Sequence, residues 1–529
     1  MFFDEGAIVA KTRISIYLVK QGITESEKIL KLDKCVNFQK VEGVGTLYSK
    51  MSSPKTPDWV GSFFGDAIDA SHLTSSSASA VFLVPISFEQ SQRIFALTFG
   101  YGYTLLEQDA IEERFGLKTA LNLAEANSLR KIKRTTVAGN ALKSNEQLPK
   151  RSSIGEFSLD AERDLLDGVT VGITGNDVFS GNVDGADSFN VSVEAGMHNI
   201  VDILSAVFEA YCSDAYKESF DWIDRISQVK SPSVISKLNA AAVGLINDCS
   251  PDIWMAVPEV IEWEKVSGFK VTGDETLYQD ILIDKVVASI RGGLADFSQL
   301  KNRQVKMLGT ESSQVLNSWS SDRCLFGEIS FGGNQYCING GKWYQIDLSF
   351  ARHVNNAYNE IPVSDIAFPD CAAKMKEGEY NKVLAESGGR SMALMDARNI
   401  SYGGGRSRIE LCDVLTDDYR FIHVKHYSGS SVLSHLFNQG LVSAELMTEP
   451  DFRKKANQKL RESCPGFDVD LNGSNPSEVV YGIITNDETS RPNIPFFSKV
   501  TFDHVANRLR MMGIKVSIKA IHQLKQAEV

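Results

Sequence analysis

The stretch IELCDVLTDDYRFIHVKHY, residues 409–427, decides the fold expected for the C-terminal part of this chain. Two short apolar runs flank Asp417 and Asp418, an acidic pair typical of turns, so the stretch predicts a β-hairpin. Core strands are mostly apolar, and polar side chains that interrupt them are candidates for chemistry. In this hairpin the interrupting residues are Glu410, Asp413, His423 and Lys425.

The segments around the hairpin predict alternating helices and strands. In order, the patterns indicate a helix over 374–387, a strand over 391–400, the two hairpin strands, a helix over 428–447, a strand over 478–486, a helix over 501–512 and a strand over 515–521. This α-β-β-β-α-β-α-β order predicts a mixed sheet that is flanked by helices.

The length of the chain predicts several domains. Its 529 residues are enough for units that each bury a core of their own. Changes in pattern predict an N-terminal α/β domain over 1–157, a mixed α/β middle domain with long helices over 158–318, and the hairpin-containing domain over 319–529. The expected class is therefore multidomain α/β (α+β).

Composition narrows the class of protein. The net charge of −12 argues against a nucleic-acid coat protein but allows a local basic groove. No apolar run approaches the ~20 residues of a membrane span, the N-terminus lacks a signal-peptide pattern, and the eight cysteines form no C-x-x-C pair. We therefore expect a cytoplasmic protein with reduced thiols and no membrane partner. The sequence also lacks P-loop, dinucleotide-binding and serine-hydrolase motifs.

The order of elements, with polar residues on the second and third strands, resembles the restriction-endonuclease-like PD-(D/E)xK superfamily. The resemblance implies catalytic roles for Glu379 in the helix, Asp413 in the second strand and Lys425 in the third. His423 stands where the superfamily has an acid and is the fourth catalytic candidate. Gln439 lies in the following helix and is a candidate for nucleic-acid binding.

The same resemblance implies a divalent cation, Mg²⁺ or Mn²⁺, held by carboxylates. Asp413 is the first candidate ligand and Glu410 the second, although alternation along a strand puts these two side chains on opposite faces. His423 weakens the match to Mg²⁺, because imidazole suits softer ions. Asp413 faces His423 directly only if an odd number of residues connects the two strands.

A second resemblance covers nearly the whole chain. The segments FALTFGYGYTLL, GKWYQID, FIHVK and LSHLFNQGLVSAEL look like a sporadically distributed bacterial family of uncharacterised activity. A patchy distribution is typical of defence islands, so this likeness implies an antiviral role. It carries over no catalytic residue.

The polar residues of the hairpin and the two resemblances together predict a metal-dependent endonuclease, a hydrolase that cleaves foreign phage DNA. RNA is the alternative substrate. The basic stretch 128–153 offers Lys131, Lys133 and Arg134 as contacts to phosphate. Two other functions stay open: a sensor that keeps the nuclease fold without its activity, and a toxin-like enzyme whose site lies in the N-terminal domain. Whether the chain forms a homo-oligomer is left open as well.

Overall fold

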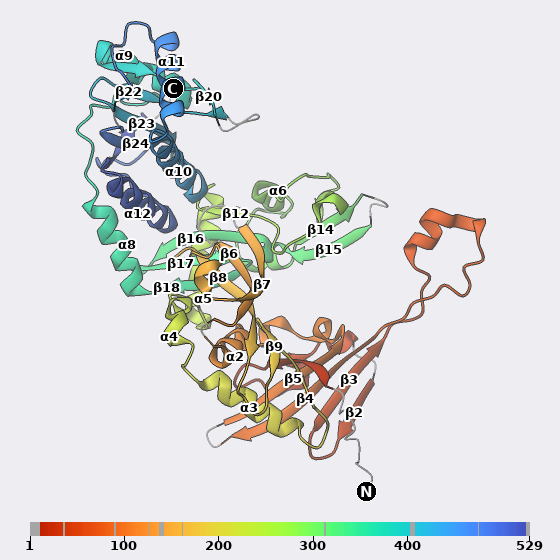
Figure 1. Ribbon diagram of the computed structural model, residues 1–529. Coiled ribbons are helices and arrows are strands. Elements are labelled where there is room, and N and C mark those ends of the chain that lie inside the picture. Colours follow the sequence, from red (N-terminus) through yellow and green to blue (C-terminus); the bar gives the residue numbers. More distant parts are fainter. Residues whose placement is uncertain are drawn as a thin grey trace. The chain divides into compact units, whose positions relative to one another are not determined.

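The computed structural model describes residues 11–34, 37–88, 91–125, 127–136, 142–160, 162–310, 314–402, 408–473 and 475–524. These residues form several sheets with helices around them (Figure 1), which confirms the expected multidomain α/β (α+β) class. The chain divides into two compact units. The first comprises Met1–Thr135, Lys143–Ala161 and Leu165–Ile223, and the second comprises Thr136–Leu142, Glu162–Asp164 and Asp224–Val529.

A ten-stranded sheet organises the first unit, in the order β2-β3-β4-β5-β1-β10-β9-β8-β6-β7. The strands are β1 (Thr12–Leu18), β2 (Asn37–Val41), β3 (Gly45–Met51), β4 (Ala78–Phe88), β5 (Ser91–Gly100), β6 (Leu129–Thr136), β7 (Leu142–Ser152), β8 (Asp164–Ile173), β9 (Gly181–Gly185) and β10 (Phe189–Val193). Helices α2 (Phe115–Leu123) and α3 (Ile200–Cys212) belong to the same unit.

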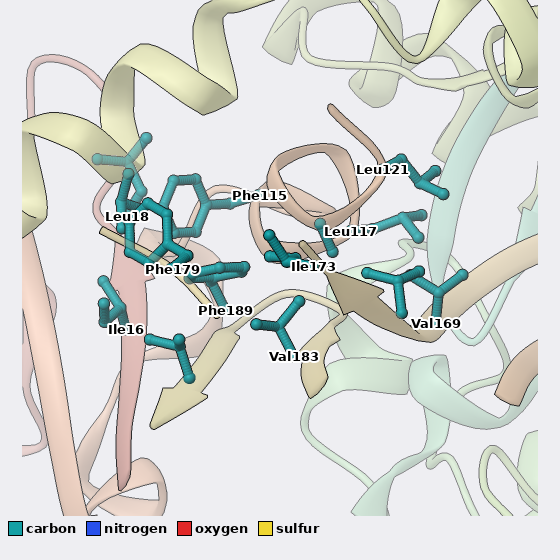
Figure 2. Close-up of a cluster of buried hydrophobic side chains, with 14 of the residues drawn as sticks. Ile16, Leu18, Phe115, Leu117, Leu121, Val169, Ile173, Phe179, Val183 and Phe189 are labelled. Atoms are coloured by element: carbon teal, nitrogen blue, oxygen red, sulfur yellow. The ribbon is translucent and has the colours of Figure 1, made fainter. Parts of the chain in front are cut away.

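The core of the first unit lies where α2 meets the sheet (Figure 2). Ile16 and Leu18 of β1 are fully buried beside Phe115 of α2 and Phe189 of β10. The basic stretch 128–153 is part of this sheet, because it forms β6 and β7. Residue 157, the expected end of the first domain, lies between β7 and β8 of that one sheet.

The first part of the second unit contains two antiparallel sheets. One has the order β11-β18-β17-β16-β12 and the other the order β13-β14-β15. Their strands are β11 (Ile226–Gln228), β12 (Ile253–Met255), β13 (Val266–Val271), β14 (Gln304–Gly309), β15 (Val315–Ser320), β16 (Leu325–Phe331), β17 (Asn334–Asn339) and β18 (Lys342–Ile346), and helices α5 (Pro232–Asn247) and α6 (Ile283–Ala288) accompany them. The five-stranded sheet joins strands from both sides of residue 318, the expected start of the last domain.

The rest of the second unit is built on a mixed sheet in the order β19-β22-β23-β24-β25 (Figure 1). The elements are α8 (Leu348–Glu360), α9 (Glu377–Ser387), β19 (Met392–Leu394), β22 (Val414–Thr416), β23 (Arg420–His426), α10 (Ser430–Leu446), α11 (Pro450–Ser463), β24 (Glu478–Thr485), α12 (Phe496–Met511) and β25 (Lys515–His522). The first three strands are antiparallel and the last three are parallel. This is the expected order of elements, with helix α11 and the small hairpin β20 (Ile400–Ser401) and β21 (Arg408–Ile409) added.

Helices cover both faces of the mixed sheet. On one face Ile422 and Val424 of β23 pack with Tyr380 and Leu384 of α9. On the other face the sheet packs against α10, α11 and α12, which supply the residues Leu433, Leu436, Phe437, Phe452, Leu460, Phe502 and Leu509. No helix among the described residues is long and apolar enough to cross a membrane.

The register of the β22–β23 hairpin shows how many residues connect its two strands. Val414 pairs with Ile422 and Leu415 with Phe421. Three residues, 417–419, therefore connect the strands beyond Thr416 and Arg420, an odd number. Tyr419 adopts a left-handed conformation with φ of 69°, which closes this short connection.

Candidate metal centre

Three carboxylates meet at one end of the mixed sheet. One oxygen each of Asp396, Glu410 and Asp413 lies within 4.8 Å of the other two. Asp413 is buried, whereas Asp396 and Glu410 are half-buried. Asp396 follows β19, and the other two acids lie in the extended segment between β21 and β22.

Backbone hydrogen bonds hold the loops that carry these acids together. The main-chain carbonyl of Asp413 accepts hydrogen bonds from the amides of Met395, at 2.8 Å, and Asp396, at 2.9 Å. The amide of Ala397 donates to Glu410 Oε1 at 2.6 Å. Main-chain contacts thus hold the backbone of Asp396 beside that of Asp413.

The carboxylate of Asp413 replaces a missing strand partner. Its Oδ2 accepts a hydrogen bond of 2.7 Å from the amide of Val424, just beyond the last paired residue of the hairpin. Burial raises the pKa of Asp413 to about 8, and the charges of Glu410, Asp396 and Glu377 act in the same direction. A bound cation would relieve this repulsion, and an all-oxygen set of ligands suits Mg²⁺ or Mn²⁺.

Glu410 joins the group because its segment is not a strand. Residues 410–413 lie between β21 and β22, so the alternation that placed Glu410 and Asp413 on opposite faces does not apply to them. The expectation of opposite faces was wrong for this reason. Gln439 of α10 donates a hydrogen bond of 3.0 Å to Glu410 Oε2 and so orients this carboxylate.

Lys425 forms an ion pair beside the acids. Its Nζ lies 2.8 Å from Glu377 Oε1 in the first turn of α9, and the two side chains are 31% and 30% exposed. Among the described residues Lys425 forms no ion pair with Asp413 itself. Glu379 is exposed and accepts a hydrogen bond from the amide of Lys376, so it caps α9.

The N-terminus of α9 approaches Asp396 closely. A Cβ atom placed on Gly378 would lie 2.9 Å from Asp396 Oδ2, which is too short for an ordinary contact. The absence of a side chain at this position therefore lets the first turn of α9 lie against the carboxylate. Glycine at position 378 has a local role in the geometry of the candidate site.

His423 belongs to the core. Its ring is fully buried and stacks on Tyr481, with 6.0 Å between the ring centroids. Neither ring nitrogen has a hydrogen-bonding partner among the described residues, and burial lowers the pKa of His423 to about 3. The imidazole is therefore neutral, and its nitrogens are not among the ligand atoms of the acidic group.

The proposed phosphate contacts of the basic stretch lie in the first unit, on β6. Arg134 forms an ion pair of 3.0 Å with Glu146, in which both side chains are largely buried. Lys133 is exposed and Lys131 is half-buried. The acidic group, by contrast, lies in the second unit.

A second basic segment contacts the hairpin that lies between two of the acids in the sequence. Helix α11 presents exposed or half-buried cations at Lys454, Lys459 and Arg461. Lys455 of the same helix donates a hydrogen bond of 3.0 Å to the carbonyl of Ser401 in β20. The β20–β21 hairpin lies between Asp396 and Glu410 in the sequence, so α11 contacts the segment that connects these two acids.

Sequence reasoning missed two residues of this site. Asp396 falls within a run that predicts a strand, and the resemblance pointed to Glu379 rather than to Glu377, two positions earlier in the helix. The available signal for Asp396 was an acid at the end of an apolar run, which is the usual place for a functional residue next to a sheet.

One comparison with known proteins gives a match, which covers nearly the whole chain. The family model DUF6119, described as a family of unknown function, matches residues 14–522. The chain belongs to this family. No curated protein and no solved structure matches the chain. Membership of the family fits the resemblance to an uncharacterised family, and it leaves the chemistry to be argued from the site.

Proposed function

We propose that the second unit is a metal-dependent nuclease whose centre is formed by Asp396, Glu410 and Asp413. The observation that carries the proposal is the convergence of these three carboxylates within 4.8 Å, next to the Lys425–Glu377 pair. The order of elements around the site is the one on which the resemblance to the PD-(D/E)xK superfamily rests, and in that superfamily acids of this kind hold Mg²⁺ or Mn²⁺. The proposed substrate is DNA, with RNA as the alternative.

Each residue has a separate task in this proposal. Asp396, Glu410 and Asp413 would bind the cation, which when bound supplies a polarised water and neutralises charge on the phosphate. Gln439 holds Glu410 in its orientation, and the amide of Val424 does the same for Asp413. Lys425, released from Glu377 or shared with it, would stabilise the charge that develops on the phosphate.

The cations of α11 support a nucleic acid as substrate. Phosphodiester backbones are bound mainly by lysine and arginine, and this helix packs on the hairpin that connects two of the acids. Its exposed cations are therefore placed to hold a strand near the acidic group. A role in defence against foreign DNA follows from the resemblance to a patchily distributed family and is part of the proposal.

Cleavage assays with purified full-length protein test the proposal. Linear and circular DNA and single-stranded RNA are incubated with Mg²⁺ or Mn²⁺, and we expect cleavage that chelation abolishes. Asp413→Asn, Asp396→Asn and Lys425→Ala should each lower the rate by about 10²–10³. Asp417→Asn is the matched control, because this exposed acid lies in the same hairpin but outside the acidic group.

Two results would contradict a nuclease. One is a wild-type protein that cuts neither DNA nor RNA with either metal. The other is cleavage that survives Asp413→Asn, because the activity would then come from another site or from a contaminant. Salt-sensitive binding of intact nucleic acid without cleavage would leave the sensor function instead.

A further inference from the structure

A polar cavity that shares no residue with the acidic group lies within the second unit. Its volume is about 280 Å³, near the lower end of the range for small-molecule sites. It is lined by the end of α5, by β16 and β17, by the residue that follows β23 and by the start of α12. The side chains that carry its chemistry are Asp252, Glu328, Tyr427 and Lys499.

Glu328 of β16 is a buried carboxyl that lines this cavity. It is only 6% exposed, and its Oε2 accepts a hydrogen bond of 3.0 Å from the amide of Phe497 in the first turn of α12. Its other oxygen, Oε1, has no hydrogen-bonding partner among the described residues. A buried acceptor without a partner is costly, and it indicates a donor that arrives from outside the chain.

The neighbouring polar groups leave the cavity acidic. Asp252 Oδ1 accepts a hydrogen bond of 2.9 Å from the Tyr427 hydroxyl, which holds the carboxyl at the cavity wall. Lys499 is the cation that lines the cavity, but its Nζ donates to Asn355 of α8 at 2.9 Å and lies over the ring of Tyr358. Two carboxyls and one ammonium thus line the cavity, and the ammonium of Lys499 also hydrogen-bonds to α8.

Burial makes the carboxyl of Glu328 a weaker acid than usual. It raises the pKa of Glu328 to about 7, and the negative charge of Asp252 acts in the same direction, against the hydrogen bond from the amide of Phe497 and the influence of the nearby Ser430 hydroxyl. Burial also raises the pKa of Asp252 and lowers that of Lys499. A cationic ligand would favour the ionised form of both carboxyls.

We propose that this cavity binds a small ligand through an alkylammonium group, with Glu328 Oε1 and the carboxyl of Asp252 as its counter-ions. The ammonium would supply the hydrogen-bond donors that Oε1 lacks, and the short apolar wall made by Leu245, Ile494 and Phe496 would contact its alkyl chain. This proposal does not depend on the nuclease activity, because the cavity shares no residue with the acidic group.

Calorimetric titration of the full-length protein with putrescine tests the proposal, with 1,4-butanediol as the uncharged probe of similar length. We expect putrescine to bind and butanediol to bind at least tenfold more weakly. Glu328→Gln keeps an acceptor oxygen for the amide of Phe497, and Asp252→Asn keeps one for Tyr427, so both variants should fold. Each should weaken putrescine binding at least tenfold, whereas Asp248→Asn, at an exposed position outside the cavity, should not.

Binding should also strengthen between pH 6 and pH 8, as the carboxyl of Glu328 becomes ionised in the presence of Asp252, Tyr427 and Lys499. The proposal is overturned if putrescine does not bind, if butanediol binds equally well, or if Glu328→Gln and Asp252→Asn both bind like the wild type. Any of these results would show that the cavity does not recognise an alkylammonium group through these two carboxyls.

Discussion

At the scale of single residues, Gly378 and His423 carry the most specific consequences. Both lie beside the candidate metal centre, one on α9 and the other on β23. Gly378 leaves room for the carboxylate of Asp396, and His423 fills the core without any hydrogen bond to the described residues. A substitution at Gly378 should therefore change the geometry of the site, whereas one at His423 should change the stability of the fold.

Gly378→Ala should weaken metal binding without loss of stability. The new Cβ would displace the Asp396 carboxylate, and changes that disturb the orientation of a ligand typically cost 10-fold to 100-fold in metal affinity. Alanine is favoured over glycine in helices, so the thermal midpoint should stay or rise. Titration with Mn²⁺ measures the affinity. Gly244→Ala is the control, since nothing lies within 4 Å of the corresponding Cβ in α5, and an equal loss of affinity there would contradict the explanation.

His423→Phe should stabilise the fold in a way that depends on pH. The folded state keeps the imidazole neutral down to about pH 3, whereas the unfolded chain takes up a proton below about pH 6.5. The unfolded state therefore binds more protons in this window, and the stability of the wild type falls as the pH decreases. Relative to His423→Phe, urea unfolding should show a loss of about 1.4 kcal/mol per pH unit below pH 6.

A difference between the two proteins that stays constant from pH 7 to pH 5 would show that His423 is accessible to protons.

The substitution His423→Asp bears on the acid position of the superfamily motif. At this fully buried position beside Tyr481, an unpaired carboxylate should destabilise the fold by several kcal/mol. A gain in Mg²⁺ affinity would instead support the interpretation of His423 as a replaced acid.

At the scale of elements, the proposed function depends on the hairpin β22–β23 and on helix α11. Lys425 lies in β23 of the hairpin, whereas Glu410 and Asp413 lie in the segment that precedes β22. Helix α11 was not expected from the superfamily order of elements, although its basic sequence is plain in FRKKANQKLR. Rigid elements hold side chains more precisely than loops do. The acids of this site lie in loops, so their positions depend on the rigid elements next to them.

The cations of α11 should contribute to nucleic-acid affinity. The triple substitution Lys454→Ala, Lys459→Ala and Arg461→Ala should weaken binding to all sequences alike. It should also lower the slope of log affinity against log salt by about one unit for each phosphate that the variant no longer neutralises. The measurement is fluorescence anisotropy over a range of salt concentrations, in the absence of divalent metal.

The double substitution Lys131→Ala and Lys133→Ala on β6 is the matched comparison. It tests the sequence-based prediction that the stretch 128–153 contacts phosphate. Arg134 is left out of this variant because its ion pair with Glu146 gives it a structural role. An unchanged slope for the α11 variant, with a lower slope for the β6 variant, would move the phosphate contacts to the first unit.

At the scale of the whole molecule, the chain consists of two units, each with its own sheets and core. Chains of several domains often unfold in more than one step. A ligand raises the stability only of the part that binds it, by about 2.7 kcal/mol at a concentration of 100 times its Kd. Calorimetry should therefore show two transitions, of which Mn²⁺ raises one.

The variant Asp396→Asn identifies the transition that responds. It should leave both transitions in place and remove the response to Mn²⁺, because it removes one of the three carboxylates. If Mn²⁺ raises both transitions equally, or still raises one in this variant, then the acidic group is not the site that binds the metal.

The sequence by itself determined the order of elements, because hydrophobic periodicity is a local property. The helices α9, α10 and α12 and the strands β23, β24 and β25 lie where the patterns predicted them. The hairpin also forms where it was expected, although its first strand, β22, is shorter than predicted and Asp413 precedes it. The sequence also indicated Glu410 and Gln439 as polar residues of interest, although it could not show that they contact each other.

Only the tertiary structure decided which acids converge. Asp396 is held at Asp413 by main-chain hydrogen bonds between segments that a pattern of periods 2 and 3.6 does not describe. Glu377 pairs with Lys425 where Glu379 had been expected at the site, because the capping of α9 turns Glu379 outward. His423 is buried against Tyr481, a contact between parallel strands far apart in the sequence. Each of these outcomes depends on irregular backbone or on packing at long range, so residue type and spacing alone could not determine it.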